Sequence, residues 1–124
     1  MAQQKQDGNA EIELASQTWD MQALMSRGQE VYAGQCATCH QADGTGLAPA
    51  FPALAGSAAA TGPLEENLAL VANGVEGSAM QAWGDILSPV DLAAVVTYQR
   101  NSFGNEAGDI VQPETVAAMT GEDP

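Results

Sequence analysis

Five consecutive residues constrain this chain more than any other part of its sequence: Cys36-Ala37-Thr38-Cys39-His40. They form a C-x-x-C-H pattern that contains both cysteines and the one histidine of the chain. Two thiols at this spacing, at the end of a helix, can bond to the vinyl groups on one edge of a porphyrin. The next residue, His40, is then held beneath the iron, where a neutral imidazole nitrogen is a good axial ligand. The pattern therefore predicts one covalently attached haem c.

Two other roles for the cysteines, a redox disulfide and a zinc site, fit the sequence less well than haem attachment. A C-x-x-C redox disulfide belongs in a βαβ context, which the pattern of this sequence lacks. A structural zinc site needs a full tetrahedral set of Cys and His ligands, and the chain has only three such residues. Haem attachment is the interpretation that uses all three.

The second axial ligand of the iron is not a histidine, because none remains, and must be a methionine, a weaker donor or water. The methionines are Met1, Met21, Met25, Met80 and Met119. Met21 and Met25 fall on the apolar face of a predicted helix, where methionine usually fills the core, and two others fall in the terminal segments. Met80 follows a run of small residues that lets the backbone approach a porphyrin closely. We therefore predict His40 and Met80 as the metal ligands, a pairing that favours electron transfer over oxygen chemistry.

Trp83, three residues after Met80, has two interpretations. It is either a packed aromatic wall beside the cofactor, which we favour, or an N–H donor to a haem propionate. No further His, Cys or Tyr forms an acid–base or nucleophilic group with these residues. The domain itself is therefore predicted to contain no catalytic residue.

Three stretches show the periodicity of amphipathic helices, and none shows a strand pattern of useful length. We predict helices over 21–34, over 63–73 with Pro63 in the first turn, and over 88–101, the last opening with a capping box. Thr18 or Asp20 can cap the first helix, and its glycine at position 34 can end it. The predicted fold class is all-α.

The predicted organisation has one domain between two polar ends. Residues 1–17 are polar and read as a flexible arm, residues 18–113 form the domain, and residues 114–124 form an acidic C-terminal tail. The longest uncharged stretch, 44–64, contains three prolines and several glycines, so it is not a continuous membrane helix.

The composition excludes some partners and favours others. The formal net charge is −13, which argues against nucleic acid and anionic membrane surfaces and leaves docking to a basic protein open. Only 5% of the residues are aromatic, so side chains alone would build a thin core for 124 residues. A large buried cofactor would help to fill that core.

Several further segments carry a resemblance to a known family. They are Arg27-Gly28-Gln29-Glu30-Val31-Tyr32, Phe51-Pro52-Ala53-Leu54-Ala55-Gly56, Asn73-Gly74-Val75, Ala79-Met80-Gln81-Ala82-Trp83-Gly84, residues 90–105 and Gly108-Asp109-Ile110-Val111-Gln112-Pro113. With the haem motif, they make the chain resemble the cytochrome c domain fused to the C-terminal end of subunit II in bacterial haem-copper cytochrome c oxidases. The resemblance covers about Thr18 to Pro113.

The resemblance implies a small class I cytochrome c fold, three to five helices wrapped around one haem. It implies that Pro52 offers its backbone carbonyl to the second imidazole nitrogen of His40, and that Leu54 lies beside the cofactor. It also implies a close crossing of the first and last helices, at Gly28 and Val31 on one and at Leu92 and Val95 on the other. A glycine inside a helix costs about 1 kcal/mol relative to alanine, so Gly28 needs such a packing reason.

The function that the resemblance implies is electron entry into a respiratory oxidase. The domain would take electrons from a soluble donor with a basic docking face and pass them to the binuclear copper centre of its own subunit. That centre and the membrane helices of subunit II would lie elsewhere, so we expect this chain to be an excised, soluble domain of a membrane-anchored parent. Its expected location is the periplasm or the outer face of the inner membrane, although residues 1–17 contain no export signal.

Two alternatives stay open. The first is a free-standing periplasmic cytochrome c that shuttles between a dehydrogenase or cytochrome complex and an acceptor. The second is a haem enzyme or gas sensor with an open sixth position, which would bind carbon monoxide readily in its reduced form.

Overall fold

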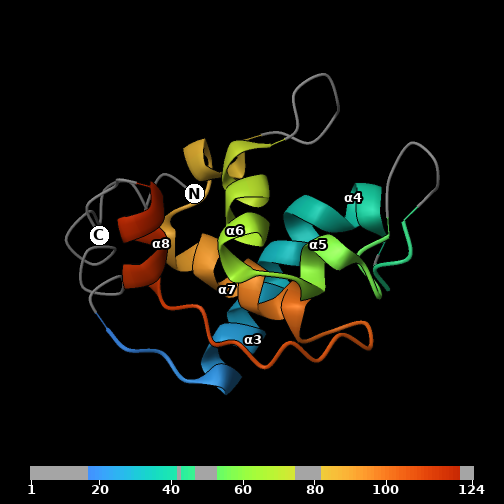
Figure 1. Cartoon of the computed structure of the whole chain (residues 1–124), viewed down its shortest axis with the longest axis horizontal. Helices are drawn as coiled ribbons and strands as arrows, with labels where there is room; N and C mark the ends of the chain where they lie inside the picture. Colours follow the sequence, from blue (N-terminus) through green and yellow to red (C-terminus); the bar gives the residue numbers. More distant parts are fainter. Residues whose placement is uncertain (1–16, 42, 47–52, 75–81, 121–124) are drawn as a thin grey trace.

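The computed structural model describes residues 17–41, 43–46, 53–74 and 82–120, and every regular element within them is a helix (Figure 1). In chain order these are α3 (Met21–Val31), the π-helix η1 (Tyr32–Cys36), α4 (Ala37–His40), α5 (Ala58–Thr61), α6 (Leu64–Asn73), the 3₁₀-helix η2 (Trp83–Asp85), α7 (Pro89–Arg100) and α8 (Pro113–Thr120). The all-α prediction is confirmed. None of these helices combines the length and apolar character needed to cross a membrane.

Local sequence signals determine where the main helices begin and end. The Oδ1 atom of Asp20 accepts a hydrogen bond from the Ala23 N–H at 2.8 Å, so Asp20 rather than Thr18 caps α3. Ser88 accepts from the Asp91 N–H at 3.2 Å at the start of α7, as the capping pattern predicts. Gly74, with a φ of 73°, ends α6.

The predicted end of the first helix at Gly34 is wrong. The helix passes through this glycine as the π-helical segment η1 and continues into α4, which ends at His40. The N–H of Ala37 donates to the carbonyl of Tyr32, the longer spacing that defines a π-turn. A glycine ends a helix only where the backbone turns to positive φ, and that turn comes at Gln41, whose φ is 69°.

The helices α3 and α7 make the most extensive contact of any two elements in the described part of the molecule. Gly28 is buried, and a Cβ atom added to it would lie 2.6 Å from the Cβ of Tyr98 and closer still to the carbonyl oxygen of Ala94. The atoms nearest to Gly28 thus belong to Ala94 and Tyr98, and the expected contacts with Leu92 and Val95 stay predictions. The observed partners are one helical turn apart, and this places them on one face of α7.

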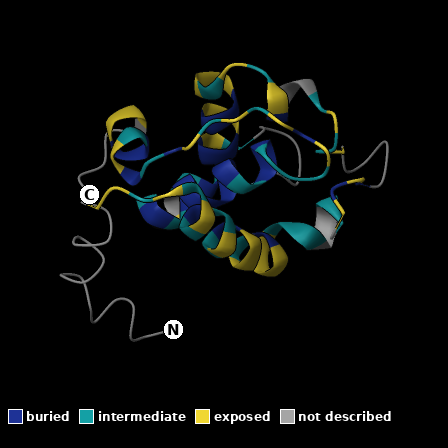
Figure 2. Cartoon of the chain, turned by 90° about the horizontal axis from the view of Figure 1, so that it is seen from below, coloured by how far each residue is buried: buried dark blue, intermediate teal, exposed yellow. Residues whose placement is uncertain are grey.

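The core lies between α3, α6, α7 and α8, and Figure 2 shows the buried residues in the centre of the molecule. Its members are Tyr32, Leu68, Val71, Ala72, Trp83, Leu92, Ala93, Val95, Val96, Val111 and Val116. The two residues expected at the crossing, Leu92 and Val95, are members of this cluster, and Val31 of α3 packs against it. Their burial explains why α7 is apolar on more than one side.

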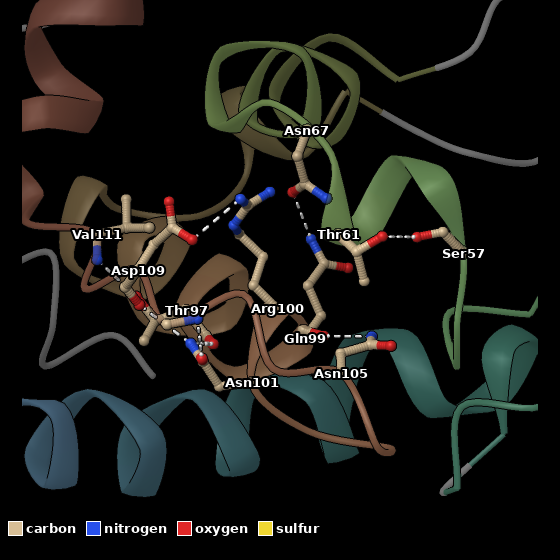
Figure 3. A network of polar contacts seen from close by, with 11 residues as sticks. Ser57, Thr61, Asn67, Thr97, Gln99, Arg100, Asn101, Asn105, Asp109 and Val111 are labelled. Carbon is tan, nitrogen blue, oxygen red and sulfur yellow. Dashed lines mark hydrogen bonds and ion pairs between the residues drawn. The ribbon is translucent and has the colours of Figure 1, made fainter.

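The segment after α7 folds back on the helices. Thr97 accepts a hydrogen bond from the Val111 N–H at 3.0 Å, and α8 then buries Val116 against the core cluster (Figure 3 shows the first contact). The sequence pattern predicted no helix here and assigned residues 114–124 to an acidic tail, because a helix of eight residues depends on packing for its stability. The domain boundary proposed at residue 113 stays a prediction.

A buried arginine lies under this returning segment. Arg100 is 3% exposed, and its Nη2 atom donates to Asp109 at 3.0 Å (Figure 3). Its Nε and Nη1 atoms have no hydrogen-bond partner among the residues that the structure describes. Because a buried charge without a counter-ion is costly, Asp109 is needed at this position.

The close helix crossing makes a testable prediction. Gly28→Ala should lower the free energy of unfolding by about 1–3 kcal/mol, because the new methyl group meets backbone and Cβ atoms that cannot rotate away. This cost opposes a gain of about 1 kcal/mol in helix propensity. Urea unfolding followed by circular dichroism measures the net effect.

Gly34→Ala is the matched control. A Cβ atom at Gly34 meets no atom of the described residues within 4 Å, so this variant should be as stable as the parent or slightly more stable. Equal stability of the two variants would contradict the close crossing.

Candidate functional site

The C-x-x-C-H motif lies at the end of the long helical segment formed by α3, η1 and α4. Cys36 is the last residue of η1, and α4 contains Cys39 and ends at His40. Cys36 and His40 are both partly exposed, and Cys36 also packs against the core cluster. The motif thus lies at the edge of the core, where the side chains of Cys36 and His40 are accessible to a ligand.

The turn after His40 is fixed by backbone hydrogen bonds. Gln41 takes a left-handed conformation, and its N–H donates to the carbonyl of Ala37 at 2.8 Å. The carbonyl of His40 accepts from the Gly46 N–H at 2.9 Å, and the carbonyl of Gln41 accepts from the Gly44 N–H at 3.1 Å. Helix carbonyls that would otherwise be orphaned are satisfied here, so the backbone at His40 has a defined direction.

Tyr32 supports the same turn from inside the core. Its hydroxyl donates to the carbonyl of Gln41 at 2.6 Å, which adds a side-chain contact to the turn. Burial raises the pKa of the Tyr32 hydroxyl well above its ordinary value, so the neutral donor is the stable form. The sequence placed Tyr32 on an apolar helix face, and nothing in its spacing indicated this polar contact.

The rings of Tyr98 and Phe103 pack beside Tyr32 and also support the turn after His40. The ring of Phe103 lies 5.1 Å from that of Tyr32 and 5.6 Å from that of Tyr98, measured between centroids. A Cβ atom added to Gly44, whose φ is 73°, would lie 2.6 Å from the Phe103 ring. Only glycine fits this close approach, so the turn after His40 rests directly on an aromatic side chain.

An exposed carboxylate closes the outer side of the turn. Asp43 accepts hydrogen bonds from the hydroxyl of Thr45 at 2.7 Å and from its N–H at 3.2 Å. These bonds, the side-chain bond first, lower the pKa of Asp43. The carboxylate is therefore charged at neutral pH and adds to the negative charge beside the motif.

The other predicted site residues divide into two groups. Leu54 is partly buried and packs against the core cluster, and Trp83 is a buried member of that cluster. Met80 and Pro52 lie outside the described residues. The second axial ligand and the carbonyl partner of the imidazole therefore stay predictions, as do the contacts of Leu54 and Trp83 with the cofactor.

The described residues fit a haem c. The motif supplies an imidazole and two thiols on less than two turns of helix, which is the donor set that covalent haem attachment needs. Several apolar residues that pack on the core keep part of their surface exposed, including Ala37, Leu54 and Leu64. A flat apolar group could cover such surface, and burying it would be favourable.

The contact of Tyr32 with the turn predicts a pH-dependent stability. Tyr32→Phe should lower the free energy of unfolding by about 0.5–1.5 kcal/mol at neutral pH, through loss of one hydrogen bond. Above pH 10.0, the ordinary tyrosine pKa, the unfolded parent loses this proton while the folded parent keeps it, so the stability of the parent falls as pH rises. The difference between the parent and Tyr32→Phe should therefore shrink in urea titrations above that pH. Parallel stability curves for the two proteins would contradict this role of Tyr32.

Three curated relatives are quinone-dependent enzyme subunits. Over 101 residues, 73% of this chain, it is 35% identical to the cytochrome c subunit of a quinone alcohol dehydrogenase from Gluconobacter oxydans (strain 621H). The corresponding subunits from Gluconacetobacter polyoxogenes and Komagataeibacter europaeus are each 34% identical over the same share of the chain. The aligned region is 20% of the length of each relative, so the chain spans about a fifth of these proteins.

Residues 23–98, more than half of the chain, match the protein-family model described as "Cytochrome C oxidase, cbb3-type, subunit III". The matched region contains the C-x-x-C-H motif and most of α3 and α7. These comparisons support a cytochrome c domain that transfers electrons, and they do not support the narrower resemblance to oxidase subunit II. The chain belongs to this cbb3-type family of class I cytochrome c domains, and haem c is its cofactor.

Proposed function

We propose that the domain is a periplasmic one-electron carrier that accepts electrons from a dehydrogenase and passes them to a further redox protein. The observation that carries the proposal is the C-x-x-C-H motif at the end of a fixed helix, in a chain similar to cytochrome c subunits of quinone alcohol dehydrogenases. This is the shuttle alternative of the sequence analysis, with a dehydrogenase as the electron source.

The residues of the chain have separate roles in this proposal. Cys36 and Cys39 would hold the haem covalently, and His40 and Met80 would be the ligands of its iron. When bound, the haem supplies a one-electron couple between ferric and ferrous iron. The protein contributes a fixed imidazole direction, through the turn after His40, and an apolar surround that includes Leu54 and Trp83.

The charge of the domain favours a basic partner. Both arginines of the described residues are paired with carboxylates, Arg27 with Asp91 at 2.6 Å and Arg100 with Asp109 at 3.0 Å. Among the residues whose burial is described, the exposed acidic ones are Asp20, Glu30, Asp43, Glu65, Glu66, Glu106 and Glu114. Such a surface attracts a positively charged protein over long range and increases its rate of association.

A second candidate is electron entry into a terminal oxidase. Its support is the sequence resemblance over residues 90–105 and 108–113, whereas the matching family model is described for subunit III of a cbb3-type oxidase and not for subunit II. Mixing experiments distinguish the two candidates. Rapid reduction by a quinone-dependent dehydrogenase favours the first, and rapid oxidation by the isolated copper domain of an oxidase subunit II favours the second.

The axial ligation makes a prediction for the optical spectrum of the haem-loaded protein. The oxidised parent should show the weak near-infrared band that arises from sulfur-to-iron charge transfer, and Met80→Ala should lose it because the sulfur ligand is removed. The reduced variant should bind carbon monoxide, whereas the reduced parent should not.

Met119→Ala is the control for this experiment. Met119 is 41% exposed on α8, so its replacement should leave the band and the stability unchanged. If the parent lacks the band and binds carbon monoxide, the carrier proposal fails and a haem enzyme or sensor takes its place.

The acidic surface makes a prediction for the kinetics of electron transfer. The second-order rate constant with a basic donor should fall by about tenfold or more as salt increases, because screening shortens the reach of the attraction. Stopped-flow mixing with a basic and an acidic cytochrome of similar potential measures this. A rate with the basic partner that does not change with salt would contradict steering by the acidic surface.

A further inference from the structure

Asn105 is buried and lies far from the C-x-x-C-H motif in the sequence, but it is bonded to a segment that contacts the turn after the motif. Asn105 is 4% exposed and lies in the segment that follows α7. Its Nδ2 atom donates to the carbonyl of Leu54 at 3.0 Å and to the carbonyl of Gln99 at 2.9 Å, and its Oδ1 atom accepts from the Gly56 N–H at 2.7 Å. Both N–H donors and the acceptor of this amide are thus used, which fixes its orientation.

The segment held by Asn105 is bonded directly to the turn after His40. The N–H groups of Leu54 and Ala55 both donate to the carbonyl of Gly44, at 2.7 Å and 3.0 Å. The same turn is closed by the bond from the Gly46 N–H to the carbonyl of His40. A short series of hydrogen bonds therefore runs from the amide of Asn105 to the backbone of His40.

We propose that Asn105 is a positioning residue for His40, acting through the segment 54–56 and the turn at Gly44. It holds the apolar segment that contains Leu54 against the turn, and so fixes the direction of the imidazole and limits the access of water beside it. This inference rests on the proposed role of His40 as an iron ligand. Because ferric haem carries more positive charge than ferrous haem, water admitted to this side lowers the reduction potential.

The chain contains a close counterpart of Asn105 that makes the same kinds of contact elsewhere. The Nδ2 atom of Asn101 donates to the carbonyls of Thr97 and Asp109, at 2.9 Å and 3.0 Å, and its Oδ1 atom accepts from the Gly108 N–H at 2.8 Å. In Figure 3, Asp109 and Asn105 lie on opposite sides of Arg100. Removal of either amide breaks three hydrogen bonds, but only Asn105 is bonded to the segment that contacts the turn after His40.

The test compares Asn105→Ala with Asn101→Ala in the haem-loaded chain. Two quantities are measured for each: the midpoint potential, and the hyperfine shifts of the haem methyl protons in the oxidised form, which depend on the orientation of the axial imidazole. Urea unfolding of both variants shows whether they lose comparable stability.

Asn105→Ala should lower the midpoint potential enough to change the ratio of reduced to oxidised protein at a fixed potential by about threefold or more. That change corresponds to about 28 mV for one electron, at about 59 mV per tenfold. The methyl shifts should change as well. Asn101→Ala should leave the potential and the methyl shifts close to those of the parent, although it also loses stability.

Equal potentials and methyl shifts in the two variants would overturn the positioning role of Asn105. If Asn105→Ala does not retain haem, the milder pair Asn105→Ser and Asn101→Ser replaces it, because serine keeps a neutral polar group that can bond through water. The midpoint potentials and methyl shifts of the two serine variants are then compared in the same way, and equal values would overturn the positioning role. A parent without methionine ligation would refute the proposed ligand set instead, and the optical spectrum of the parent detects that case separately.

Discussion

The close contact between α3 and α7 is the interaction on which the rest of the structure depends. It joins residues 21–31 to residues 89–100, and it is possible because Gly28 has no side chain where the helices meet. The salt bridge between Arg27 and Asp91 lies on the same pair of helices. Past the crossing, α3 continues into the haem motif and α7 continues into the segment that contains Phe103 and Asn105. Two distant parts of the chain are thereby brought to one turn, the turn after His40.

The sequence predicted well those parts of the fold that depend on neighbouring residues. The cap of α3 at Asp20, the opening of α7 at Ser88 and the end of α6 at Gly74 all follow from short-range hydrogen bonds and backbone preferences. It failed at Gly34, where the helix continues as a π-segment, and it gave no helix for residues 113–120. Both depend on packing against elements far away in the chain, which local patterns do not encode.

In the site, too, the sequence predicted the features that depend on neighbouring residues and missed those that depend on distant contacts. Cys36, Cys39 and His40 were predicted from spacing alone, because the chemistry of covalent haem attachment requires that spacing. The residues that fix the turn after His40 gave no such signal, since Tyr32, Gly44 and Asn105 act through contacts that exist only in the folded chain. Met80 and Pro52 remain predictions of the sequence. The family comparisons replaced the specific oxidase assignment with a broader cytochrome c family, because short haem motifs are shared among many electron carriers.

The bonds of Asn105 also bear on the order in which this molecule assembles. They join residues that are 49 and 51 positions apart, and the side chain of Gln112 bonds to the backbone of Trp19 across 93 positions. Contacts of such long range form late, because a long loop must close before they contribute any stability. A growing chain therefore presents its two thiols and its imidazole before the turn beside them is fixed. We therefore expect that a haem can be attached before the domain is fully folded, and that the surroundings of His40 become rigid only when the last part of the domain folds back.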